Sequence, residues 1–125
     1  MIDFKHVALS VSSPGEIRNF YTDILGMKQI RSFILNQDLA EQIFGIKSEI
    51  PAYLLHKDNL YLEVFILSQN KEKSINHICF SIKNREELIH NVRAKGYECI
   101  RIKRETNDLV FIKDKSGNIF EIKKE

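Results

Sequence analysis

A seven-residue pattern occurs twice in this 125-residue chain. Residues 5–11 read Lys-His-Val-Ala-Leu-Ser-Val and residues 76–82 read Asn-His-Ile-Cys-Phe-Ser-Ile, so histidine, serine and the apolar positions coincide in order. Self-similarity of this kind is the sequence signature of a duplicated structural unit. The chain is therefore predicted to contain two copies of one module, each built around one copy of the pattern.

Both copies have the alternation of a β-strand, in which successive side chains point to opposite faces. One face carries branched or aromatic apolar residues, which are suited to a core. The other face carries a histidine, His6 or His77, followed by small side chains. Small neighbours leave space beside each imidazole, so these two histidines are candidate ligand-binding residues.

The elements around each pattern also repeat, as strand, helix and three more strands. The first helix is expected between the cap at Ser13 and Gly26, and a further short helix from Asp38 is expected to turn Leu39 and Ile43 inward. The expected strands are 3–11, 27–35, 51–56 and 60–67, then 76–82, 97–102, 109–113 and 118–123, with a second-half helix at 85–95. This order predicts an α+β fold of two βαβββ modules, 1–67 and 76–125, joined by a polar linker at 68–75 within one domain, 1–125.

The repeat pairs two glutamates as well. Residues 60–64 align with residues 118–122, which places Glu63 on Glu121, each within an otherwise apolar strand. A carboxylate in that setting costs several kcal/mol unless it is paired, hydrogen-bonded or bound to a metal. By alternation, Glu63 faces the same side as His6. Two imidazoles and two carboxylates suit a borderline divalent cation, with nickel or zinc expected first and cobalt or manganese next.

Composition favours an ordinary globular protein, because 43% of the residues are hydrophobic and 29% are charged. The net charge of +2 is spread among mixed signs, so no nucleic-acid partner is indicated. The sequence has no 18-residue apolar run and begins with an expected strand instead of a signal peptide, so no membrane association is expected. Cys79 and Cys99 lack a Cys-x-x-Cys spacing and favour reduced thiols in the cytoplasm. His56 and His90 fit no pattern and are predicted to face solvent.

Several segments together resemble the vicinal oxygen chelate superfamily, and within it glyoxalase I. They are the two histidine patterns, Leu62-Glu63, Phe-Tyr-Thr-Asp-Ile-Leu-Gly-Met at 20–27 and Asp-Lys-Ser-Gly-Asn-Ile-Phe-Glu at 114–121. The resemblance implies a mixed sheet curved around a metal bound by His6, Glu63, His77 and Glu121. It also implies a homodimer in which His6 and Glu63 of one chain meet His77 and Glu121 of the other.

The implied reaction is that of a metal-dependent lyase or isomerase. Its substrate would be a small α-hydroxycarbonyl compound or a thiol adduct (a hemithioacetal), processed through an enediolate, with Glu63 or Glu121 as the base. Ser10 and Leu67 stand where glutathione-using relatives have arginine and asparagine, so the resemblance does not extend to a glutathione site. The alternatives are a ligand-sequestering binding protein of the same fold and an epimerase or dioxygenase of the superfamily.

Overall fold

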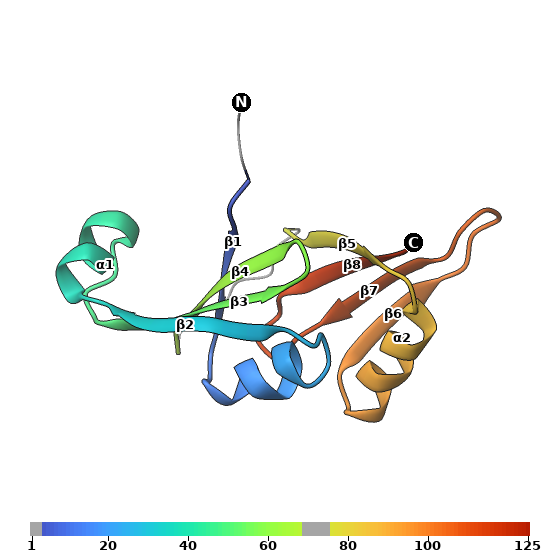
Figure 1. The fold of residues 1–125 in the computed structure, drawn as a ribbon, viewed down its shortest axis with the longest axis horizontal. Helices are drawn as coiled ribbons and strands as arrows, with labels where there is room; N and C mark the ends of the chain where they lie inside the picture. The colour runs from blue at the N-terminus through green and yellow to red at the C-terminus, as the bar shows by residue number, and fades with distance from the viewer. Residues whose placement is uncertain (1–3, 69–75) are drawn as a thin grey trace. The chain divides into compact units, whose positions relative to one another are not determined.

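The computed structural model describes residues 4–68 and 76–125 of the chain. They belong to two compact units, Met1–Gln69 and Asn70–Glu125, which we call the first and second modules (Figure 1). All of the expected linker except Ser68 lies outside the described residues. Within those residues, no helix is long and apolar enough to cross a bilayer.

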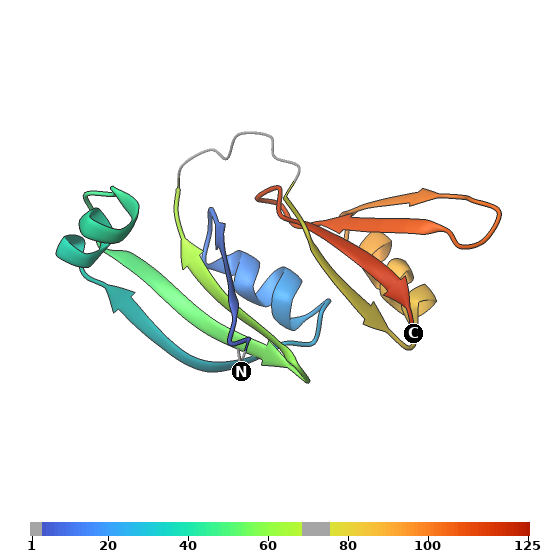
Figure 2. The same ribbon diagram turned by 90° about the horizontal axis from the view of Figure 1, so that it is seen from above.

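Both modules have the predicted order of strand, helix and three strands, and the second view shows a sheet and a helix against it in each (Figure 2). The first module contains β1 (Val7–Val11), η1 (Ile17–Thr22), β2 (Lys28–Leu35), α1 (Gln37–Phe44), β3 (Ile50–Lys57) and β4 (Leu60–Ile66). The second contains β5 (Ile78–Ile82), α2 (Arg85–Ala94), β6 (Glu98–Ile102), β7 (Leu109–Lys113) and β8 (Ile119–Lys124). The predicted α+β fold of two βαβββ modules is confirmed.

The two sheets have the same topology. Their strand orders are β1-β4-β3-β2 and β5-β8-β7-β6, and in each sheet the first pair is parallel while the others are antiparallel. The register is equivalent too, because Ala8 pairs with Glu63 and Cys79 pairs with Glu121. Ala8 and Cys79 each lie two residues after a histidine of the repeated pattern, so the duplication extends to individual positions.

One face of each sheet forms a core with the helix that follows its first strand. In the first module, Phe20 and Tyr21 of η1 are fully buried, and their rings meet edge to face with centroids 5.0 Å apart. This helix is wound as a π-helix, unlike the α-helix expected, since the N–H groups of Asp23 and Leu25 donate to carbonyls five residues earlier. In the second module, α2 buries its predicted apolar stripe of Leu88, Ile89 and Val92.

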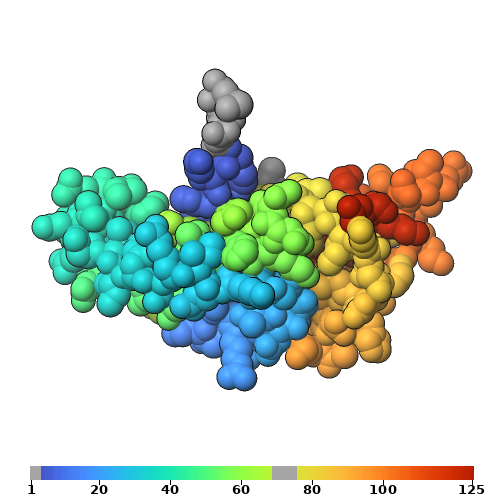
Figure 3. Space-filling model, viewed as in Figure 1, coloured from blue at the N-terminus to red at the C-terminus, as the bar shows by residue number. Residues whose placement is uncertain are grey.

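The short helix α1 packs on the opposite face of the first sheet, and two expectations about it are wrong. Its N-cap is Asn36, whose side chain accepts a hydrogen bond from the N–H of Leu39 at 2.9 Å, and not Asp38. Leu39 and Ile43 are 44% and 60% exposed, whereas Ala40 is fully buried. The small side chain of Ala40 lets the helix backbone approach the sheet, while the larger Leu39 and Ile43 stay exposed. The space-filling view shows the segment of α1 at the surface of the first module (Figure 3).

Candidate functional site

His6 and Glu63 lie together in the first module. His6 directly precedes β1, while Glu63 lies in the middle of β4, the parallel neighbour of β1. The His6 Nε2 atom is 3.7 Å from the Oε2 atom of Glu63. The imidazole is exposed and the carboxylate is largely buried, so the pair lies at the surface of the sheet.

His77 and Glu121 form the matching pair of the second module. His77 directly precedes β5, and its Nε2 atom is 3.3 Å from the Oε1 atom of Glu121 on β8. Two atoms that bind one cation at about 2.1 Å each lie about 3–4 Å apart, depending on the angle between them. Both His–Glu separations fall in that range, so each pair suits two positions of a metal coordination sphere.

The turn before β8 accounts for the Asp, Gly and Asn residues of the segment 114–121. The Oδ1 atom of buried Asp114 accepts hydrogen bonds from the N–H groups of Ser116 at 3.0 Å and Asn118 at 2.8 Å. The Asn118 Nδ2 atom donates to Asp114 Oδ2 at 2.7 Å, and Gly117 supplies the positive φ of 89° that the turn requires. This closed turn fixes the start of β8 and therefore the position of Glu121.

The two carboxylates have different neighbours. Lys123 places its Nζ atom 3.5 Å from Glu121 Oε2, and the partner of Glu121 on β5 is the exposed Cys79. Partial burial raises the pKa of the Cys79 thiol, and the negative charge of Glu121 raises it further. In the first module, the equivalent positions are Ala8 and Phe65.

Helix α1 covers only part of the face on which Glu63 lies. Phe65 joins a buried apolar cluster with Ala40, Ile50 and Ala52. The cluster is closed from outside by Phe44, whose ring meets that of Phe65 with centroids 5.6 Å apart. The apolar cover begins two residues beyond Glu63 along β4, so the part of the face that contains His6 and Glu63 stays open.

His56 also belongs to this open part, which corrects the expectation that it faces solvent. Its ring is half-buried and stacks on that of Tyr61, with centroids 5.4 Å apart and an interplanar angle of 20°. The sequence contains a signal for this position. The short turn after His56 pairs it with Tyr61, and alternation then places both residues on the face of Glu63.

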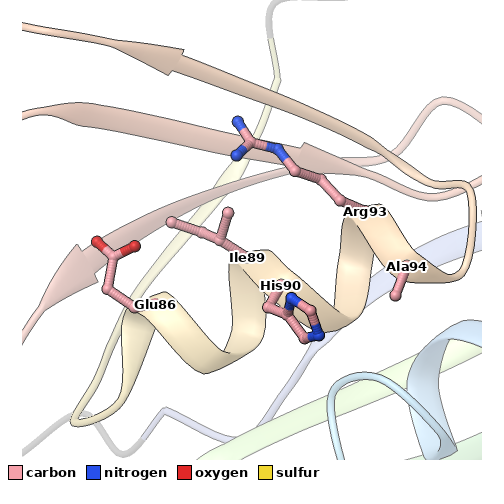
Figure 4. A pocket seen from close by; sticks show the side chains of 5 residues that line it. All are labelled: Glu86, Ile89, His90, Arg93 and Ala94. Atoms are coloured by element: carbon pink, nitrogen blue, oxygen red, sulfur yellow. The ribbon is translucent and has the colours of Figure 1, made fainter.

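Helix α2 has a hollow on its surface. It is lined by Glu86, Ile89, His90, Arg93 and Ala94 (Figure 4). None of the four expected metal ligands lines it. His90 is exposed, as predicted.

The four expected ligands are thus brought together as two pairs, one in each module. Among residues 4–68 and 76–125, no three His, Cys, Asp or Glu side chains are grouped closely enough to hold a metal ion. Each module by itself therefore brings together one imidazole and one carboxylate.

This arrangement agrees with a match to a family model, that of the glyoxalase/bleomycin resistance protein/dioxygenase superfamily, over residues 3–122. The chain belongs to this superfamily. The likeness to vicinal oxygen chelate proteins seen in the sequence is confirmed. Among curated proteins, the lactoylglutathione lyase GLX1 of Arabidopsis thaliana is 27% identical in an alignment of 124 residues that covers 95% of this chain and 43% of that protein. The chain spans less than half the length of this relative.

Solved structures of the superfamily share the fold. A glyoxalase family protein from Enterococcus faecalis has a TM-score of 0.72 at 22% identity, covering 96% of this chain and 95% of its own. A mutant of the fosfomycin resistance protein FosX from Listeria monocytogenes has a TM-score of 0.77 at 19% identity, with 98% and 92% covered. That FosX structure contains Mn(II) and 1S,2S-dihydroxypropylphosphonic acid.

Proposed function

We propose that this protein is a metal-dependent, glyoxalase I-like lyase or isomerase that acts on a small α-hydroxycarbonyl compound or a hemithioacetal. The observation that carries the proposal is the equivalence of the two His–Glu pairs. Each module brings one imidazole and one carboxylate to donor spacing at the same register positions. Some enzymes of the superfamily use a metal site of two histidines and one glutamate. A site of that kind in this protein would leave Glu63 without a role.

In this proposal His6, Glu63, His77 and Glu121 hold one divalent ion. Neutral imidazole nitrogens and carboxylate oxygens are donors for nickel or zinc, and next for cobalt or manganese. When bound, the metal supplies Lewis-acid polarisation of the substrate oxygens. The assembly is a homodimer in the cytoplasm, and the two free thiols suit that reducing compartment.

The protein's own part in the reaction is to move one proton. A carboxylate oxygen of Glu63 or Glu121 removes a proton from the carbon that bears the substrate hydroxyl. The same oxygen returns the proton to the neighbouring carbon, and the hydroxyl proton passes to the former carbonyl oxygen, so the substrate is isomerised with no net gain or loss of atoms. Both carboxylates are largely buried, which reduces competition from water for that proton.

The test is the metal content of the purified protein, measured together with exchange of a substrate carbon-bound proton with deuterated solvent. His6→Ala and His77→Ala should each lose the metal, because each removes one of the two imidazole donors of the proposed four-ligand site. His90→Ala is the matched control and should keep the metal, since His90 is equally a surface histidine but lies on α2. Glu63→Gln and Glu121→Gln retain an oxygen donor. They should bind the metal more weakly, and the variant that lacks the base should lose roughly 10²–10⁴-fold in exchange rate.

Two outcomes would contradict the proposal. The first is that the wild-type protein binds no metal even after incubation with nickel or zinc. The two His–Glu pairs would then be separate side-chain contacts and not metal ligands. Full metal with full proton exchange in both glutamine variants would exclude a carboxylate base and favour a protein that sequesters its ligand.

A further inference from the structure

A β-bulge in β2 places two basic residues on the face of the first sheet that carries Glu63. Gln29 pairs with Leu55 and Arg31 pairs with Leu54, so Ile30 between them has no cross-strand partner. In a regular strand Lys28 and Arg31, three positions apart, would point to opposite faces. The extra residue brings both to the same face. Bulges often redirect a side chain in this way next to functional sites.

The register then places Arg31 in line with the proposed metal ligand. Leu54 is the cross-strand partner of both Arg31 and Glu63, and Glu63 is the partner of Ala8. These four residues form one row across the sheet. Arg31 and Glu63 are two strands apart, about 10 Å between Cα atoms at the usual strand spacing. A small molecule at Glu63 is therefore within reach of the long Arg31 side chain.

The guanidinium group of Arg31 is oriented by stacking and is not neutralised. Its Cζ atom lies 5.5 Å from the ring centroid of Phe33, on the same face. A guanidinium over an aromatic ring keeps its in-plane N–H donors free for a carboxylate or a phosphate. Arg31 is exposed, and no carboxylate of the described residues lies within ion-pair distance of it. By contrast, Lys123 is already paired with Glu121.

The apolar cover of the first sheet restricts where a ligand can bind beside Arg31. The cluster of Phe65, Ala52 and α1 covers the face beyond Glu63, which leaves the rows of His6 and Glu63 open. The second module has no such feature. Its β6–β7 pairing has no bulge, and the residue in the row of Glu121 that corresponds to Arg31 is Ile100.

We propose that Arg31 binds an anionic group, a phosphate or a carboxylate, of a substrate that occupies the open face beside His6 and Glu63. The proposal rests on the proposed function and narrows its substrate class to small anionic α-hydroxycarbonyl compounds. Lys28, in the adjacent row, adds positive charge at the same edge of the sheet.

The test compares two probes that differ only in a phosphate. Dihydroxyacetone phosphate and dihydroxyacetone are titrated calorimetrically into the zinc-loaded full chain. Wild type should bind the phosphate ester about tenfold more tightly, which is the lower range for a hydrogen bond to a charged group. Arg31→Met should abolish this preference and leave the affinity for dihydroxyacetone unchanged. Arg18→Met is the matched control, because Arg18 is exposed on η1 at the other face of the sheet.

The outcomes separate this inference from the proposed function. Equal affinities for both probes in wild type, or a preference for phosphate that survives in Arg31→Met, would overturn the role of Arg31 while metal-dependent dihydroxyacetone binding persisted. If dihydroxyacetone bound His6→Ala as well as wild type, the metal site itself would be refuted. Loss of the preference in Arg31→Met alone supports the anion site.

Discussion

Glu63 and Glu121 occupy equivalent positions, yet their neighbours give them different electrostatic environments. Lys123 approaches Glu121 to 3.5 Å, while the corresponding residue beyond Glu63 is Phe65, buried under α1. A cation beside a metal-binding carboxylate competes with the metal for its negative charge. The two modules therefore differ at single residues around the histidine and glutamate positions that they share.

Replacing Lys123 tests this competition. Lys123→Met should tighten zinc binding by a few-fold, because Glu121 then offers its whole charge to the metal. The free energy of unfolding of the metal-free protein should change by less than about 1 kcal/mol, since the lysine side chain is 63% exposed and exposed ion pairs contribute little. Lys113→Met, which removes the 3.5 Å pair with Glu98, is the matched control. Zinc affinity is measured by chelator competition. A lower or unchanged affinity in Lys123→Met would contradict this competition.

At the scale of elements, α1 distinguishes the two modules, because the second has no counterpart between β6 and β7. Its contact with the sheet depends on the small size of Ala40. Ala40→Leu should destabilise the protein by about 1–3 kcal/mol, the usual cost of overpacking a closed core. Ile43→Ser, on the exposed side of the same helix, should change stability by no more than about 0.5 kcal/mol. The free energy of unfolding of both variants is measured by urea denaturation. Similar losses of stability in the two variants would show that Ala40 does not mark the buried face of α1.

The same helix shows where sequence patterns were insufficient. The pairing of each histidine with its glutamate was predictable, because strand alternation and the repeat are both legible in the residues. The inward face of α1 was not, because Leu39, Ala40 and Ile43 are all apolar and the fit against Phe65 decided which one was buried. The bulge at Ile30 could not be predicted from the sequence either. No glycine or proline marks it, and the segment reads as an unbroken strand until its pairing with β3 is known.

At the scale of the whole molecule, duplication gives each module half of a proposed four-ligand site. One nitrogen and one oxygen donor leave most of a metal's coordination unfilled, so two modules must meet to bind it strongly. The resemblance to glyoxalase I implies that the two modules come from different chains of a homodimer. Mixing two inactive variants distinguishes this arrangement from a site completed within one chain.

We expect an equimolar co-refolded mixture of His6→Ala and His77→Ala to regain metal that neither variant binds alone. In a mixed dimer with sites across the interface, the intact first module of one chain faces the intact second module of the other. Half of the dimers are mixed, and each has one intact site of two. The mixture should therefore hold about a quarter of the wild-type metal. A mixture of His6→Ala with Glu63→Ala is the matched control and should regain none, because every first module is damaged. If mixed dimers form, as native mass spectrometry can show, and the first mixture still holds no metal, each site is completed within a single chain.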